Sequence, residues 1–134
     1  MKKLKVFATP YLVWMTVFIV VPLLMVAFIA FFGAAADMIC LVFPSVPPFL
    51  RAVICSFFEI SRGCAEFSGA AELLPLLRYV GVAFALGFSG VSVACQISER
   101  AGEISLSILP YLAKKLIFGL AMAASGGIFA IFVL

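Results

Sequence analysis

Apolar residues run through this chain in long blocks that short polar segments separate. Residues 6–36 carry no charged side chain, and the stretch Phe7 to Phe32 is 26 residues long, about 39 Å of helix at 1.5 Å per residue. A hydrocarbon core about 30 Å thick needs roughly 20 such residues per crossing. The pattern predicts an amino-terminal transmembrane anchor helix over residues 1–36, kinked but not broken at Pro22.

A cleavable signal peptide is the alternative for this start. Lysines stand at positions 2, 3 and 5, and the small residues Ala34 and Ala36 follow the apolar run. The run far exceeds the 7–15 residues usual for a signal peptide. A retained helix is therefore favoured.

The second apolar block, residues 38–58, differs from the first. Pro44, Pro47 and Pro48 interrupt it, and Arg51 falls inside it. Proline removes a backbone donor and clashes with the preceding turn, and non-helical backbone at membrane depth needs protein or water around it. We expect a Pro-broken or re-entrant segment here.

Two further apolar runs, residues 79–98 and 116–134, are long enough to cross a membrane. Polar links, residues 59–78 and 99–115, precede them. The expected fold is all-α and integral to the membrane: a polytopic helical bundle with about three full transmembrane helices plus one re-entrant segment. Residues 37–134 would form its main membrane region.

Composition narrows the classes of function. The chain is 66% hydrophobic, with 9 Lys and Arg, 6 Asp and Glu and no His. So few charges cannot coat a soluble domain, and the scattered basic residues give no nucleic-acid footprint. Without histidine the usual catalytic triads and zinc sites are not expected. We expect no enzyme activity, no cofactor and no metal, and the lipid bilayer as partner.

The basic residues also predict the membrane topology of the chain. If residues 38–58 dip in and return, Arg100, Lys114 and Lys115 lie on the same side as the three amino-terminal lysines, six basic residues against three for a full crossing. Lys and Arg are retained on the cytoplasmic side. We expect a multi-pass protein of the cell membrane with a cytoplasmic amino terminus.

Glu59 is the most informative charged residue, because it directly follows the uncharged stretch 52–58. Ionisable groups beside hydrocarbon are costly and normally face a cavity or a partner. Glu59 is either a ligand or proton site, balanced by Arg62 or Arg51, or an interface residue where a helix leaves the bilayer.

The run 79–98 is rich in glycine and polar residues. Gly81, Ala85 and Ser89, spaced four apart, form a small-residue seam typical of close helix contacts. Alternatively, the segment 87–92 is an unwound turn that exposes backbone groups to a ligand. A second seam, Gly119, Ala123 and Gly127, predicts helix packing in the last run.

From Phe49 onward the order of these motifs resembles the carboxyl-terminal part of the sporulation integral membrane protein family (YlbJ-like). The matching motifs are FFEISRG, at Glu59 to Gly63, and GFSGVSVACQ, at Gly87 to Gln96. That family is similar to nucleoside-recognition or gate domains of transporters. The chain departs from the family pattern at three positions, Arg62, Ser89 and Ala94.

This resemblance implies a transporter-like protein that recognises or gates a small polar solute during spore formation, in cortex assembly. It implies a substrate site formed by Glu59, Gly63, Gly87, Ser89, Gly90, Ser92 and Gln96. We expect a homo-oligomer or a larger membrane partner. The alternatives are a structural or regulatory subunit that packs through Gly119, Ala123 and Gly127, and a truncated or fused gene product.

A second resemblance covers only the first 30 or so residues. The stretch ATPYLVWMTVFIVVPLLMVAF is similar to the opening helix of an ABC-transporter permease of the polyamine type. The coupling loop of such permeases has no counterpart, because only five residues separate Gly102 from the Ile-x-Leu-Pro-like ILPYL at 108–112, where nine are required. A permease fragment therefore stays a minor alternative.

Overall fold

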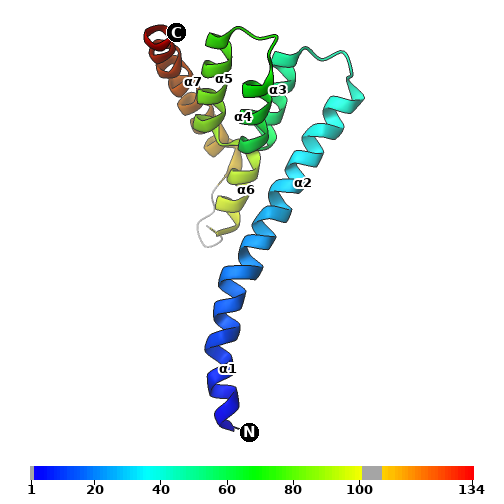
Figure 1. Cartoon of the computed structure of the whole chain (residues 1–134), viewed down its shortest axis with the longest axis vertical. Coiled ribbons are helices and arrows are strands. Elements are labelled where there is room, and N and C mark those ends of the chain that lie inside the picture. The colour runs from blue at the N-terminus through cyan, green and yellow to red at the C-terminus, as the bar shows by residue number, and fades with distance from the viewer. Residues whose placement is uncertain (1, 101–106) are drawn as a thin grey trace. The chain divides into compact units, whose positions relative to one another are not determined.

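The computed structural model describes residues 2–100 and 107–134, with side chains for residues 8–98 and 107–134. Throughout these residues the regular secondary structure is helical (Figure 1). The chain divides into two compact units, residues 1–31 and 32–134. Each unit is described by itself.

The first unit contains α1 (Lys2–Met15), a π-helical turn η1 (Thr16–Val20) and the start of α2 (Val21–Val42). The N–H of Val21 donates to the carbonyl of Thr16, five residues back. Pro22 follows directly and has no N–H to donate to the carbonyl of Phe18. The backbone hydrogen bonds therefore change here from a four-residue to a five-residue spacing, and the helix does not end. The helix continues through Pro22, as expected.

The second unit begins with the end of α2 and a short helical hairpin, α3 (Pro48–Phe58) and α4 (Ile60–Gly69). The sequence pattern places the interrupted segment at residues 38–58, but residues 38–42 complete α2 and the hairpin occupies 48–69. Pro48 stands in the first turn of α3, where a missing N–H costs nothing, so it starts a helix instead of breaking one. The expected polar link after residue 58 contains the returning helix α4.

Three more helices complete the second unit: α5 (Pro75–Phe88), α6 (Gly90–Arg100) and α7 (Ile108–Val133). The interruption expected between residues 87 and 92 lies between α5 and α6. α7 begins earlier than the predicted residue 116, because Pro110 falls in its first turn and does not stop it. Of the predicted link 99–115, residues 101–106 lie outside the described residues.

Glycines bring α5 and α7 together along their length, and Figure 1 shows these two helices side by side. A Cβ on Gly119 would lie 3.1 Å from the Cβ of Phe88, and one on Gly127 would lie 3.3 Å from Val80. The seam predicted on the last run is therefore covered by α5 of the same chain. A partner that docks on Gly119 and Gly127 would find this face occupied.

Within the described part of the chain, three stretches of helix are long and apolar enough to cross a membrane: Ala8–Val42 with 35 residues, Pro75–Ser98 with 24 and Ile108–Val133 with 26. The apolar helix Pro48–Phe58 is shorter, about 16 Å long at 1.5 Å per residue. The predicted all-helical fold with three long apolar helices is confirmed for the described residues, whereas the interrupted segment lies later in the chain than predicted. The protein is a possible multi-span membrane protein for which a lipid bilayer is a plausible surrounding.

Candidate functional site

The tip of the α3–α4 hairpin is a single extended residue, Glu59, with φ −149° and ψ 129°. Its N–H donates to the carbonyl of Cys55 at 2.8 Å, and its carbonyl accepts from the N–H of Gly63 at 3.0 Å. Its carboxylate accepts from the backbone N–H of Arg62 at 2.7 Å. Glu59 thus caps α4 through its side chain, which satisfies a donor that the first helical turn leaves free.

Burial distinguishes this carboxylate from an ordinary cap. Glu59 is only 2% exposed, and among the residues with described side chains no cation forms an ion pair with it. The sequence offers Arg62 or Arg51 as its counter-charge. In the structure Glu59 instead accepts from the backbone N–H of Arg62. The guanidinium groups of Arg51 and Arg62 pair with Glu66 and Asp37.

The second interruption lies at Ser89 and Gly90. Both have left-handed backbone conformations, with φ of 69° and 77°. Such a conformation is unfavourable for serine. The hydroxyl of Ser89 donates to the carbonyl of Leu86 at 3.2 Å and accepts from Nζ of Lys115, on α7, at 3.3 Å. A lysine therefore contacts the carboxyl end of α5, where the helix dipole favours positive charge.

The two interruptions touch each other. A Cβ on Gly90 would lie 3.2 Å from the backbone nitrogen of Glu59, 3.2 Å from the carbonyl oxygen of Phe58 and 3.3 Å from the Cα of Glu59. Two half-helix junctions that are far apart in the sequence are therefore in contact. The ends of α3 and α5 and the starts of α4 and α6 meet at this point, which we call the junction site.

Ser92 lies near the start of α6 and is the second buried polar residue near the junction. It is 1% exposed, and within the described part of the chain its hydroxyl has no hydrogen-bond partner. Other helix serines, such as Ser56 and Ser125, donate to the carbonyl four residues back. For Ser92 that carbonyl belongs to Phe88, on the other side of the break. The break therefore deprives this hydroxyl of the acceptor that the other helix serines use.

The remaining predicted site residues divide into packing and peripheral positions. Gly63 lets α4 approach α3, since a Cβ there would overlap the backbone of Ser56. Gly87 lets α5 approach α7, since its Cβ would lie 2.9 Å from the Cα of Gly119. Gln96 is half-buried, further along α6. Of the predicted set, Glu59, Ser89, Gly90 and Ser92 build the junction site.

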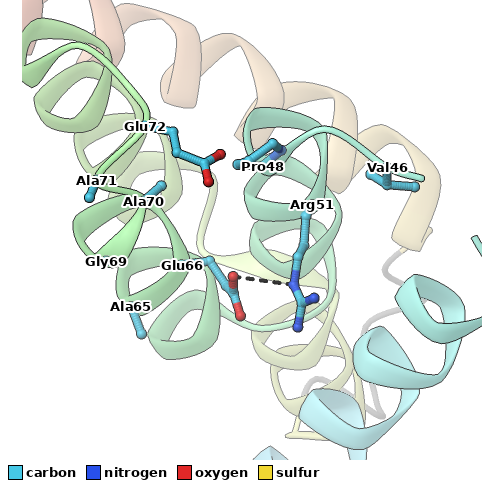
Figure 2. Close-up of a pocket in the computed structure, with 9 residues that line it drawn as sticks. All are labelled: Val46, Pro48, Arg51, Ala65, Glu66, Gly69, Ala70, Ala71 and Glu72. Carbon is cyan, nitrogen blue, oxygen red and sulfur yellow. Dashed lines mark ion pairs between the residues drawn. The ribbon is translucent and has the colours of Figure 1, made fainter. Parts of the chain in front are cut away.

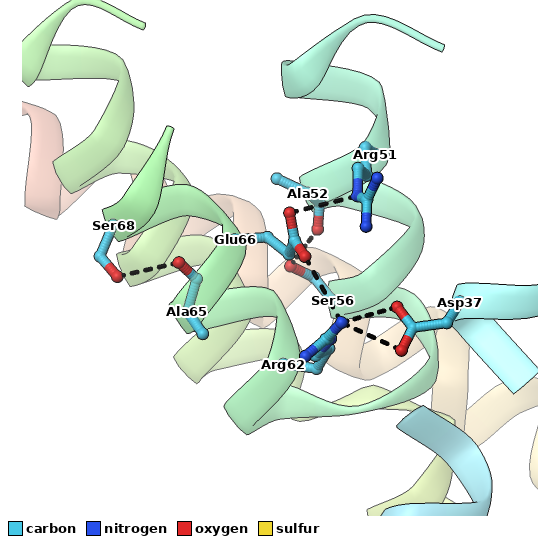
Figure 3. Close-up of polar contacts among 8 residues, drawn as sticks. All are labelled: Asp37, Arg51, Ala52, Ser56, Arg62, Ala65, Glu66 and Ser68. Atoms are coloured by element: carbon cyan, nitrogen blue, oxygen red, sulfur yellow. Dashed lines mark hydrogen bonds and ion pairs between the residues drawn. The ribbon is translucent and has the colours of Figure 1, made fainter. Parts of the chain in front are cut away.

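A chain of ion pairs lies beside the hairpin, and no sequence motif predicts it (Figure 3). Nη2 of Arg62 donates to both carboxylate oxygens of Asp37, at 2.8 and 3.0 Å, and lies 3.8 Å from Glu66. Glu66 also pairs with Arg51 across the hairpin at 3.3 Å (Figure 2). The hydrogen bonds to Asp37 raise the pKa of Arg62 above its ordinary value. The guanidinium group of Arg62 therefore stays charged at physiological pH.

The same region contains a group of potential metal ligands. Asp37, Cys55 and Glu66 place their ligand atoms within 4.8 Å of one another. Both carboxylates are already paired with arginine. A cation would have to displace a guanidinium group from each of them, so the arrangement is that of a neutralised charge network.

Comparison with protein families, with curated proteins and with solved structures finds no match for this chain.

Proposed function

We propose that this chain is a transporter-like membrane protein that recognises or gates a small polar solute at the junction site. The observation that carries the proposal is the contact of Gly90 with the backbone of Phe58 and Glu59. Broken helices that meet inside a membrane expose backbone amides and carbonyls to a ligand, as in known transporter folds. A helical hairpin about 16 Å long is shorter than a hydrocarbon core about 30 Å thick, so Glu59 at its tip would lie inside the core without crossing it.

The chemistry of the junction site favours a solute with hydrogen-bond donors and acceptors. Glu59 offers carboxylate oxygen, and Ser92 offers a hydroxyl that has no partner among the described residues. Burial of both groups makes each hydrogen bond to a ligand more valuable than it would be in water. The resemblance of the Glu59–Gly63 and Gly87–Gln96 motifs to the YlbJ-like family supports a role in spore formation, with a nucleoside-like solute as the first class to test.

The test compares Glu59→Gln with Glu72→Gln. Both changes remove one negative charge, but Glu72 lies in the exposed connection between α4 and α5. The gene is deleted in its source and replaced with each variant. We expect heat-resistant spore counts to fall about tenfold or more with Glu59→Gln at normal membrane abundance, and to stay unchanged with Glu72→Gln. Equal counts for the two variants would reject the junction site.

A binding measurement tests the solute directly. Purified protein in detergent is titrated with uridine and adenosine while its thermal unfolding is followed, because a ligand that binds only the folded state raises the midpoint. We expect a rise with the unchanged chain, and a smaller rise with Ser92→Ala. A rise of the same size with Ser92→Ala would remove Ser92 from the site.

A further inference from the structure

A cavity of about 540 Å³ lies between the end of α2, the turn at residues 43–47 and the hairpin. Two arginines line it, Arg51 on α3 and Arg62 on α4. Their side chains are 45% and 42% exposed. The side chains that line this cavity differ from those of the junction site, so a ligand bound here would be distinct from the solute of the proposed function.

Both guanidinium groups keep unused donors. Each carries five N–H groups in a planar fork. Arg62 uses only Nη2 for Asp37, and its buried Nε has no partner in the described part of the chain. Arg51 approaches Glu66 only as an ion pair, Nε to Oε2 at 3.3 Å, and its guanidinium group donates no hydrogen bond to a described residue. The two arginines can therefore donate several hydrogen bonds to an incoming anion.

Unused guanidinium donors, and not a net positive charge, suit this cavity to an anion. Its lining contains Arg51, Arg62 and one carboxylate, Asp37. Glu66 is not part of the lining but lies 3.3 Å from Arg51 and 3.8 Å from Arg62, so the four side chains together carry no net charge. Pairs of guanidinium forks match the tetrahedral oxygens of phosphate, which they bind with charge-assisted hydrogen bonds.

The rest of the lining is apolar and lies where a membrane-spanning helix ends. Leu41 and Phe43 belong to the lining and are strongly exposed. A charged pocket with an apolar rim at the end of such a helix matches the boundary between lipid headgroups and acyl chains. We propose that this cavity binds a phosphate group through Arg51 and Arg62. A phospholipid headgroup and free phosphate share this chemistry.

The experiment uses the full chain purified in detergent and three ligands: phosphatidylglycerol, a glucosyl diacylglycerol with the same acyl chains, and inorganic phosphate. Native mass spectrometry measures how much lipid stays bound. The variants are Arg51→Ala and Arg62→Lys. Arg78→Ala is the matched control, because Arg78 loses the same charge but donates to the carbonyl of Ser68 outside the cavity.

We expect retention of phosphatidylglycerol to fall about tenfold or more with Arg51→Ala, the usual result of losing hydrogen bonds to a charged group. Arg62→Lys keeps the charge but removes the fork, so it should lower retention as well. Arg78→Ala should leave retention unchanged. Competition by inorganic phosphate at equal concentration would identify free phosphate as the source, and its failure to compete would identify the headgroup.

Two results would overturn the proposal: equal retention of the glucosyl lipid, or equal loss in Arg51→Ala and Arg78→Ala. If Arg51→Ala does not fold, Arg51→Lys keeps the charge and removes the fork. That variant should still lower retention of phosphatidylglycerol, and unchanged retention would then reject the site.

Discussion

The ring of Phe67, on α4, packs directly on Gly81, on α5. A Cβ at residue 81 would lie 2.6 Å from Cγ of Phe67, closer than two carbon atoms can approach. Phe67 is among the largest fully buried side chains of the described residues. This contact packs the hairpin against α5. The predicted small-residue seam that contains Gly81 therefore accommodates the ring of Phe67.

Gly81→Ala should therefore destabilise the protein by about 1–3 kcal/mol, the usual cost of overpacking. The free energy of unfolding in mixed detergent micelles, followed by circular dichroism, measures it. Gly33→Ala is the control, because nothing lies within 4 Å of its Cβ. Adding Phe67→Leu to Gly81→Ala should recover part of the loss. A loss that is simply additive in the double variant would argue against the contact.

Gly90→Ala should destabilise the junction site for two reasons. Its φ of 77° is unfavourable for alanine, and the new Cβ would press on the backbone of Phe58 and Glu59 at 3.2 Å. We expect a loss of about 1–3 kcal/mol in the same unfolding measurement. Gly33→Ala, in the middle of α2, should instead gain about 0.5–1 kcal/mol from helix propensity. Equal effects of the two substitutions would contradict the observed close approach.

Ser92→Ala and Ser56→Ala form a matched pair of buried serines with opposite expected effects. The Ser56 hydroxyl donates to the carbonyl of Ala52 at 2.7 Å, whereas that of Ser92 has no described partner. Removing an unsatisfied hydroxyl should stabilise by about 1 kcal/mol or be neutral, and removing a satisfied one should cost about 1 kcal/mol. Unfolding in detergent compares them. A larger loss for Ser92→Ala would show that its hydroxyl has a partner.

The reactivity of Cys64 reports on Glu59. Burial, and secondly the negative charge of Glu59, raise the pKa of the Cys64 thiol above its ordinary value. The reactive thiolate therefore forms only at higher pH. Glu59→Gln removes the second cause, so the midpoint of the alkylation rate should move to lower pH. Mass spectrometry after timed alkylation follows this residue, and Glu72→Gln should leave its midpoint in place.

Exchanging the charges of Asp37 and Arg62 tests their ion pair. Asp37→Arg and Arg62→Asp each create two like charges and should destabilise the chain, and the double variant should restore part of the loss. Because the two side chains are 44% and 42% exposed, we expect a coupling of only about 1 kcal/mol or less. A double-mutant cycle of unfolding free energies measures it at low and high salt. A coupling that does not fall with salt would contradict an exposed ion pair.

The long apolar helices, which are candidate membrane spans, could be predicted because hydrophobicity alone determines them. The uncharged runs Phe7–Phe32 and 116–134 coincide with observed helices. The high glycine content of residues 79–98 indicates the break at Ser89 and Gly90. The hairpin is displaced from its expected position because Pro48 can either break a helix or begin one. The helix α4 is also missed, because its sequence is mostly polar and reads as a link between apolar runs. Its apolar face is buried only when it packs on α3 and α5.

The charge network could not be predicted from pattern alone. Asp37 and Arg62 are 25 residues apart, and no periodicity links two positions across a turn. The sequence does hold two signals. Asp37 is the first charged residue after the long uncharged run, and Glu66 stands four residues after Arg62, a spacing at which helix side chains meet. The contact of Gly90 with Glu59 depends on tertiary packing and has no signal in the sequence.

Arg62 binds two neighbouring residues, one through its backbone and one through its side chain. Its backbone N–H donates to the carboxylate of Glu59, and its guanidinium group donates to Asp37 near the end of α2. A rotation of the last turns of α2 would therefore pull on the same residue that orients the acid at the hairpin tip. Arg62 therefore connects Asp37, near the end of α2, to the buried carboxylate of Glu59 at the hairpin tip.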